Sequence, residues 1–331
     1  MNTFRAAVVD KSGEEVGIRL ERLQQDSLMS GDVTVRVHYS SVNYKDSLVA
    51  RTDGRVARQY PLIPGIDLAG TVLESTDPRY APGAPVLAHG YDLGVAHHGG
   101  HAELARLPAD WLVPLPAGLS ARQAMAIGTA GFTAALSVLR LEHMGLRPGS
   151  GVVLVTGASG GLGSTAVALL AARGYEVAAS TGSSDAHDYL RGLGATQIVD
   201  RSETSVASDR PLERARWAGA IDAVGGTTLA YISRTLDYGA SVAACGNTGG
   251  AEVSTTVFPF ILRAANVLGI DSVQLPLDER TALWQRLAED LRPPRLDDSI
   301  ARDVTLDQVP EVLLAIHRGE IRGRTVVRMA D

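Results

Sequence analysis

Hydrophobic positions follow two different patterns along the chain, and the pattern changes near residue 120. Before that point, short β-like runs such as 33–37, 70–73 and 85–88 are separated by turns such as Pro82-Gly83. Short apolar runs between glycine- and proline-containing turns are typical of strands. The first 120 residues therefore predict a β domain shaped like an irregular barrel.

After residue 120, apolar strands alternate with helical spacing. Residues 121–141 predict a helix, the apolar run Val152–Thr156 predicts a buried parallel strand, and 164–173 predicts the helix that follows it. The alternation continues with a helix at 185–193 and strands at 177–180, 197–200, 220–224, 241–245 and 267–271. Strands that alternate with helices form βαβ units, which predicts an α/β fold with a doubly wound parallel sheet.

The last segment returns to a strand–helix–strand pattern over 303–328, and we expect it to rejoin the first domain. The predicted organisation has three parts. Residues 1–120 begin the first domain, 121–272 form the second domain, and 273–331 return to the first.

Composition and charge narrow the possible functions. The single cysteine, Cys245, excludes an intramolecular disulfide and a multi-cysteine zinc cluster. A net charge of -6 gives no general reason to expect nucleic-acid binding. The sequence contains no run of about 18 apolar residues, so it does not predict a membrane span. The charges at Arg5 and Asp10 do not suit a signal peptide. We expect a cytoplasmic protein that binds neither nucleic acid nor membrane.

A glycine-rich loop, Thr156-Gly-Ala-Ser-Gly-Gly-Leu-Gly163, lies between the predicted strand and helix. Its glycines let backbone N–H groups approach a diphosphate and let the helix pack on the strand, while the helix N-terminus favours negative charge. A tight turn alone would also use glycine, but the strand–loop–helix context favours a dinucleotide.

The end of the second strand indicates which dinucleotide is bound. NAD sites usually place an acidic residue there, whereas this chain has no acid until Asp185. A carboxylate would repel a 2′-phosphate, so its absence favours NADP. Arg201, just after the third strand, is the candidate positive partner, the alternative being an exposed loop charge. Further donors in the loop are Thr181, Gly182 and Ser183.

Two common nicotinamide chemistries do not match the sequence. The short-chain type needs Tyr-x-x-x-Lys, but the chain's two lysines, Lys11 and Lys45, are not preceded by tyrosine at that spacing. The zinc type needs Cys, His or carboxylate ligands in the first domain. The segments that would hold them are Val42–Asp46 and Pro64–Gly70.

At these segments the chain resembles the medium-chain dehydrogenase/reductase superfamily. The zinc enzymes of that superfamily have Cys where this chain has Asn43, and His-Glu where it has Ile66-Asp67. The chain therefore resembles the zinc-independent, quinone-oxidoreductase-like members. This resemblance implies a GroES-like catalytic domain, a Rossmann domain and no metal.

A narrower resemblance, to the acrylyl-CoA reductase subfamily (AcuI/YhdH), covers both domains. It rests on Ser40–Asp46, Tyr60–Gly70, His97–Glu103, Gly128–Ala134, Trp217–Asp222, Ala243–Gly246, Phe258–Arg263 and Gly323–Thr325. It implies an NADPH-dependent oxidoreductase acting on CH–CH groups, which reduces acrylyl-CoA to propionyl-CoA, and a homodimer. The same fold also leaves open a quinone, enal or enone reductase, and a non-catalytic NADPH-binding sensor.

The resemblance implies NADPH contacts at thirteen positions of this chain. They are Tyr44, Thr133, Ser159, Gly160, Gly161, Leu162, Thr181, Gly182, Ser183, Arg201, Asn247, Asp271 and Arg324. Small residues in Gly128–Ala134 would let the nicotinamide ring approach. Family members often have Arg or Lys in place of Ser183, so we expect weaker binding of the 2′-phosphate here.

The expected chemistry is hydride addition to the β-carbon of an unsaturated thioester, with donors that stabilise the enolate oxygen. Tyr44 is the candidate donor, or else it only packs against the nicotinamide while solvent supplies the proton. Asn43 is a second candidate donor. Asp67 has either a chemical role or is a relic of the zinc site, held by hydrogen bonds. Lys45 and Asp46 are expected to form a local ion pair.

Three further groups of residues allow more than one interpretation. Arg51, Arg55 and Arg58 are candidates for binding CoA phosphates, the alternative being a solvated basic loop. The glycine-rich segment with His97, His98 and His101 suggests a flexible loop rather than a metal site. Cys245 is expected to be a buried small residue and not a nucleophile.

Overall fold

The computed structural model describes residues 3–329, apart from the side chains of residues 298 and 299. The chain divides into two compact units. One unit contains the residues up to Thr129, residues 273–290, and those from 296 onward, while the other contains 130–272 and 291–295. The predicted fold class, a GroES-like β domain with a Rossmann domain, is confirmed.

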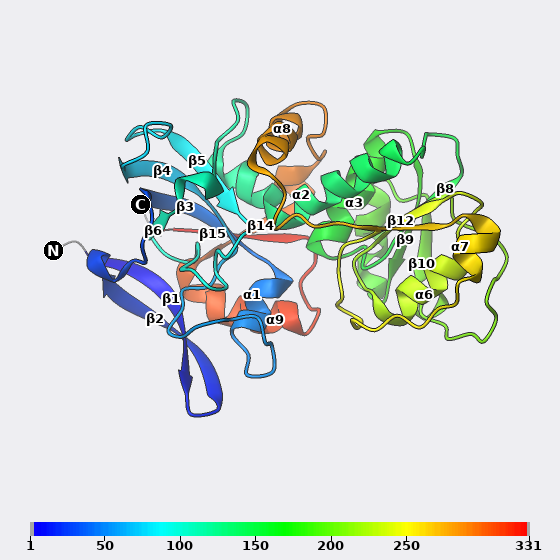
Figure 1. Cartoon of the computed structure of the whole chain (residues 1–331), viewed down its shortest axis with the longest axis horizontal. Coiled ribbons are helices and arrows are strands. Elements are labelled where there is room, and N and C mark those ends of the chain that lie inside the picture. The colour runs from blue at the N-terminus through cyan, green and yellow to red at the C-terminus, as the bar shows by residue number, and fades with distance from the viewer. Residues whose placement is uncertain (1–2, 330–331) are drawn as a thin grey trace. The chain divides into compact units, whose positions relative to one another are not determined.

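The first unit is built on a seven-stranded sheet and a separate β-hairpin. The sheet has the order β14-β15-β3-β4-β5-β7, with β6 also paired to β3, and β1 pairs with β2 (Figure 1). The strands are β1 Thr3–Ser12, β2 Glu15–Gln24, β3 Val33–Val42, β4 Asp67–Ser75, β5 Pro85–His89, β6 Leu104–Leu107, β7 Leu112–Pro114, β14 Ala301–Thr305 and β15 Arg324–Arg328.

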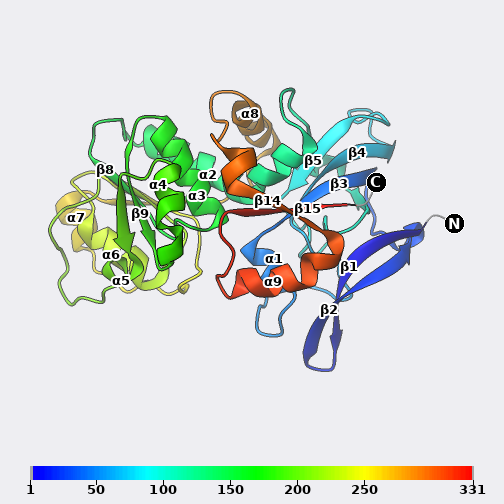
Figure 2. The same ribbon diagram turned by 180° about the vertical axis from the view of Figure 1, so that it is seen from behind.

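Helical segments of this unit are short. They are α1 Tyr44–Val49, α8 Leu277–Ala288, α9 Val309–His317, the 3-10 turns η1 Gln25–Ser27, η2 Ala109–Trp111 and η5 Leu306–Gln308, and the π-helical η4 Leu296–Ile300. Helices α1 and α9 lie side by side in both views (Figures 1 and 2).

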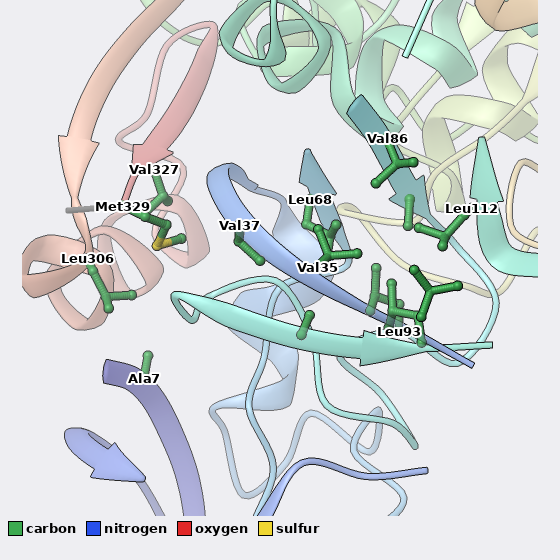
Figure 3. Packing of buried hydrophobic residues seen from close by; sticks show 14 of the residues in the cluster. Ala7, Val35, Val37, Leu68, Val86, Leu93, Leu112, Leu306, Val327 and Met329 are labelled. Carbon is green, nitrogen blue, oxygen red and sulfur yellow. The ribbon is translucent and has the colours of Figure 1, made fainter. Parts of the chain in front are cut away.

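Alternating side chains explain how the sheet forms its core. On β3, Val35 and Val37 are buried while Arg36 between them is exposed, as the period of two in a strand requires. Figure 3 shows these valines packed with apolar residues from β4, β5 and β7. Val327 of β15 joins the same core, because β15 pairs antiparallel with β3. The end of the chain is therefore part of the first sheet.

The second unit is a six-stranded sheet in which every neighbouring pair is parallel, with the order β10-β9-β8-β11-β12-β13. Helices surround it (Figure 1). Its strands are β8 Val152–Val155, β9 Glu176–Thr181, β10 Gln197–Asp200, β11 Gly219–Asp222, β12 Ser241–Ala244 and β13 Asn266–Gly269. Its helical segments are α3 Gly161–Ala172, η3 Ser184–Ala186, α4 His187–Gly192, α5 Arg201–Thr204, α6 Gly226–Thr235 and α7 Phe258–Arg263.

This strand order locates the ligand site of the unit. The chain starts the sheet in the middle, at β8, and the order reverses between β8 and β11. In doubly wound sheets, ligands bind outside the carboxyl ends of the strands at such a reversal. The glycine-rich loop follows β8 directly, so the topology places it at that point.

Helix α2, Ala121–His143, is broken at Gly128, which has φ 52° and ψ -166°. By length and composition α2 is the one helix in the described part of the chain that could cross a membrane, but 78% of that stretch is buried inside the protein. A buried core helix passes the same test, and its burial here agrees with that interpretation.

Candidate functional site

The glycine-rich loop has the geometry of a diphosphate site. Gly157 has φ +57°, and a Cβ on Gly163 would lie 2.3 Å from the carbonyl oxygen of Gly157. Both positions therefore need glycine. Helix α3 begins at Gly161 without an acidic side chain in its first turn, and the first N–H groups of any helix lack acceptors within it. A helix N-terminus of this kind favours a negatively charged group, in agreement with the predicted diphosphate contacts, which remain a prediction.

The predicted 2′-phosphate residues come together at the end of β9. Thr181 Oγ1 donates to Ser159 Oγ at 3.2 Å and accepts from the backbone N–H of Ser183 at 3.1 Å. A Cβ on Gly182 would lie 2.7 Å from Cζ of Arg201, so the guanidinium rests against the Gly182 backbone. The structure thus places the positive charge of Arg201, which directly follows β10, beside this loop.

The remaining predicted cofactor residues of this unit are more scattered. Thr133 Oγ1 donates to Ser272 Oγ at 2.7 Å, and both side chains are buried. Ser272 had no signal in the sequence, although it follows the predicted Asp271. Asp271 and Asn247 are exposed. Contacts of these residues with NADPH remain predictions.

Asp222, which the sequence analysis did not single out, holds the point of strand reversal together. Its carboxylate accepts from Thr156 Oγ1 at 2.5 Å and from the backbone N–H of Gly225 at 2.9 Å. Cys245 Sγ donates to the Asp222 carbonyl oxygen at 3.2 Å. Burial raises the pKa of Cys245 to about 12, so the thiol stays protonated at neutral pH and is no nucleophile.

In the first unit, Asp67 gathers the residues of the predicted catalytic segment. Its side chain is 0% exposed. Ser41 Oγ donates to Oδ2 at 2.6 Å, and Asn43 Nδ2 donates to Oδ1 at 2.7 Å. The backbone N–H of Thr129 donates to Oδ2 at 2.8 Å, and its Oγ1 to Oδ1 at 3.2 Å. Every donor comes from a segment distant from Asp67 in sequence.

Arg324 enters the same cluster from β15. Nη1 donates to Asn43 Oδ1 at 3.0 Å, and Nη2 donates to Ser41 Oγ at 2.6 Å and lies 3.6 Å from Asp67 Oδ2. Its side chain is 2% exposed. The structure therefore gives Arg324 internal partners, and a direct contact with NADPH stays a prediction.

The predicted ion pair between Lys45 and Asp46 is wrong. Asp46 is fully buried, and its carboxylate accepts from the backbone N–H of Asn43 at 2.8 Å and of Ile66 at 2.9 Å. Neighbouring positions on a helix point in different directions, and Lys45 is only half-buried. Asp46 instead caps α1 and ties it to the segment before β4.

Tyr44, the first residue of α1, has a stacking partner that the sequence did not suggest. Its ring lies parallel to that of His317 at the end of α9, with centroids 5.9 Å apart and an interplanar angle of 10°. The contact depends on the packing of α1 against α9, seen in Figure 2. His317 therefore lies parallel to the ring of the candidate donor.

The three candidate CoA-binding arginines lie on the exposed loop after α1. Arg51 pairs with Asp53 at 2.8 Å, and Arg58 pairs with Asp92 at 3.1 Å. Arg55 has φ 52° and no ion-pair partner among the described residues. Exposed pairs are worth only about 0–1 kcal/mol, so both paired arginines remain available to an anionic ligand.

Comparison with known proteins identifies the family. Residues 29–117 match the alcohol dehydrogenase GroES-like domain, and 161–289 match the zinc-binding dehydrogenase domain. The acrylyl-CoA reductase AcuI of Ruegeria pomeroyi is 52% identical over 98% of this chain and 98% of that protein.

The chain belongs to the medium-chain dehydrogenase/reductase family, in its acrylyl-CoA reductase subfamily. The crystal structure of YhdH from Salmonella enterica in complex with NADP has a TM-score of 0.95 and is 49% identical in sequence. The match covers 98% of this chain and 100% of the YhdH chain. The putative quinone oxidoreductase YhfP of Bacillus subtilis is 48% identical over 98% of this chain and 99% of that protein. Its crystal structure with NAD bound has a TM-score of 0.95 and covers 99% of this chain and 100% of that one.

Zinc does not fit the cluster of this family member. Of the three positions Asn43, Ile66 and Asp67, only Asp67 offers a carboxylate. Both of its oxygens accept from N–H or O–H donors. The Arg324 guanidinium, 3.6 Å from Asp67 Oδ2, would repel a divalent cation. Structural and catalytic zinc sites need several thiolate, imidazole or carboxylate ligands. Among the described residues, no group of three or more such side chains could hold a metal ion.

The histidine segment is not the flexible loop that its glycines suggested. His101 is fully buried, with Nδ1 3.0 Å from Ser40 Oγ, and His97 Nε2 lies 3.0 Å from the Ser30 carbonyl oxygen. Burial lowers the pKa of His101 to about 3. A Cβ on Gly99 would lie 2.3 Å from the Gly65 carbonyl oxygen. The glycines therefore serve close backbone packing rather than mobility.

Asp46 predicts a pH dependence of stability. Burial, with the nearby charge of Asp67, raises the pKa of Asp46 to about 7. The folded protein thus holds this proton more tightly than the unfolded chain, and the resulting stabilisation is lost as pH rises through about 7. We expect the stability of the wild type relative to Asp46→Asn to fall between about pH 4 and about pH 8 in urea unfolding. The exposed Asp26→Asn is the matched control. A wild-type advantage over Asp46→Asn that does not change with pH would contradict this assignment.

Proposed function

We propose that this chain is an NADPH-dependent reductase that converts acrylyl-CoA to propionyl-CoA. The observation that carries the proposal is the full-length similarity to AcuI, at 52% identity. The NADP-bound structure of YhdH, which superposes over nearly the whole chain, supports NADPH as the cofactor. The proposal is supported in the chain itself by the glycine-rich loop before α3 and by Arg201, which lies against Gly182.

When bound, NADPH supplies the hydride that adds to the β-carbon of the thioester. The backbone N–H groups of Gly161 and Leu162 would hold the diphosphate, and Arg201 would neutralise the 2′-phosphate. The Tyr44 hydroxyl donates to the thioester oxygen as it becomes an enolate, so that charge develops beside a donor already in place. The His317 ring lies parallel to the Tyr44 ring. The α-carbon then takes a proton from Tyr44 or from solvent.

A quinone or enone reductase is the second candidate function. It is favoured by the similarity to YhfP, which is named a putative quinone oxidoreductase and has been solved with NAD bound. Ser183 agrees with the NAD bound to YhfP, because an uncharged residue at that position weakens discrimination against NAD.

A cytoplasmic location is part of the proposal and is supported by the single cysteine in the sequence.

One assay separates these functions. The oxidation of NADPH is followed by its absorbance with acrylyl-CoA, crotonyl-CoA and a quinone as acceptors, and the series is repeated with NADH. We expect kcat/KM to be highest for acrylyl-CoA with NADPH. Activity with the quinone alone would overturn the proposal. Binding of NADPH without turnover of any acceptor would indicate a sensor instead.

The loop arginines predict how the CoA group is recognised. Replacing Arg51, Arg55 and Arg58 together by Ala should raise KM for acrylyl-CoA about tenfold or more, because each exposed charge pair is worth about 0–1 kcal/mol and about 1.4 kcal/mol in total corresponds to tenfold. Arg55→Ala should account for a large share, since the other two arginines also pair with carboxylates. KM for a small enone without phosphates is the control. An equal rise for both substrates would show that the loop does not bind CoA.

We also propose a homodimer that forms through the second unit. Strand β13 is at an edge of its sheet. Large apolar side chains are exposed on and near this strand and α7, namely Val257, Phe258, Ile261, Leu262 and Val267. An exposed apolar patch beside an open sheet edge supports association of two copies.

The patch gives a direct test by light scattering after size exclusion. The wild type should have the mass of two chains, and Ile261→Asp should shift it toward one chain, because a charge would be buried in the interface. Leu314→Asp is the matched control, since Leu314 is similarly exposed on α9. A wild-type monomer, or equal effects of both variants, would refute this interface.

A further inference from the structure

The guanidinium of Arg324, on β15, makes polar contacts with two other backbone segments. Nη1 donates to the carbonyl oxygen of Val42 at 3.2 Å as well as to Asn43 Oδ1 at 3.0 Å. Nε donates to the carbonyl oxygen of Ala126 at 3.2 Å. Arg324 itself comes from β15. The end of β3, the segment before the break in α2, and β15 therefore meet at one side chain.

This arrangement sets the orientation of the Asn43 carboxamide. Its Oδ1 accepts from Arg324, and its Nδ2 donates to Asp67 at 2.7 Å. Exchanging the amide oxygen and nitrogen would put donor against donor and acceptor against acceptor. The planar fork of the guanidinium can reach these acceptors together, whereas a lysine ammonium is a single point charge.

The charge of Arg324 is buried beside two carboxylates. Burial lowers the pKa of Arg324, and the charges of Asp67 and Asp46 oppose this effect without cancelling it. The space is also filled, because a Cβ on Gly128 would lie 2.3 Å from Nη2 of Arg324 and 2.4 Å from Oδ2 of Asp67.

We infer that Arg324 is a positioning residue for the reduction, acting through Asn43 and Tyr44 rather than through the cofactor. Asn43 immediately precedes the first turn of α1, where Tyr44 begins the helix. Holding the Asn43 side chain and the Val42 carbonyl fixes the start of α1, and with it the position of the candidate donor. The inference rests on the proposed function of Tyr44.

Chemical rescue tests this role. Arg324→Ala removes the guanidinium and leaves a space of its shape beside two buried carboxylates. We expect kcat for acrylyl-CoA to fall about a hundredfold, as misplacement of a catalytic group can cause, with the Kd for NADPH unchanged. Added guanidinium, well below denaturing concentrations, should restore a large part of kcat. Arg328→Ala, at the exposed end of the same strand, is the control and should show neither loss nor rescue.

Several outcomes would overturn the inference. They are an unchanged kcat, a raised Kd for NADPH as the main effect, or a rescue of Tm by guanidinium without a rescue of kcat. If Arg324→Ala does not fold, Arg324→Lys decides, because wild-type kcat in that variant would exclude a need for the fork. Failure of the proposed function is seen separately, as absence of acrylyl-CoA reduction by the wild type. The variants are then compared with whichever acceptor the wild type reduces.

Discussion

The buried carboxylate of Asp67 is the interaction on which the geometry of the catalytic segment depends. It accepts hydrogen bonds from Ser41 and Asn43 at the end of β3 and from Thr129 just after the break in α2. Burying a carboxylate without such donors costs far more free energy than an ordinary packing contact contributes to stability. Conversely, each donor would lose its partner without the carboxylate. The start of α1, where Tyr44 lies, is held in place by this mutual requirement.

The same cluster explains why α2 breaks where it does. Gly128 has φ 52° and faces Arg324 and Asp67 so closely that any Cβ would clash with both. Glycine reaches that conformation without strain, and the next helical stretch then begins with Thr129 hydrogen-bonded to Asp67. The small residue at 128, expected to make room for a nicotinamide ring, is already required by packing within the first unit.

Features encoded within a short stretch of sequence could be predicted, and features assembled from distant segments could not. The strand–loop–helix–strand pattern around the glycine-rich loop follows from local glycines and apolar periodicity, and the structure confirms it in β8, α3 and β9. The stacking of His317 on Tyr44 depends on the packing of α1 against α9, which no local pattern reveals. Asp46 was predicted to form an ion pair with Lys45 because the two residues are adjacent, but its partners are the backbone N–H groups of Asn43 and Ile66. The glycines near His101 were interpreted as a sign of a flexible loop. Flexible loops and close backbone packing both use glycine, so the sequence alone does not distinguish them.

Arg201 determines how much Ser183 matters to cofactor choice. In this chain the charge beside the β9 loop comes from the residue after β10, lying against Gly182, rather than from the loop itself. A charge-assisted hydrogen bond contributes about 1.5–3 kcal/mol, which corresponds to about tenfold or more in affinity. If Arg201 contacts the 2′-phosphate as proposed, one such contact would be sufficient for a preference for NADPH without a basic residue at 183. Arg201 is exposed, so salt would screen that contact, and the missing acid at the end of β9 would contribute to the proposed preference as well.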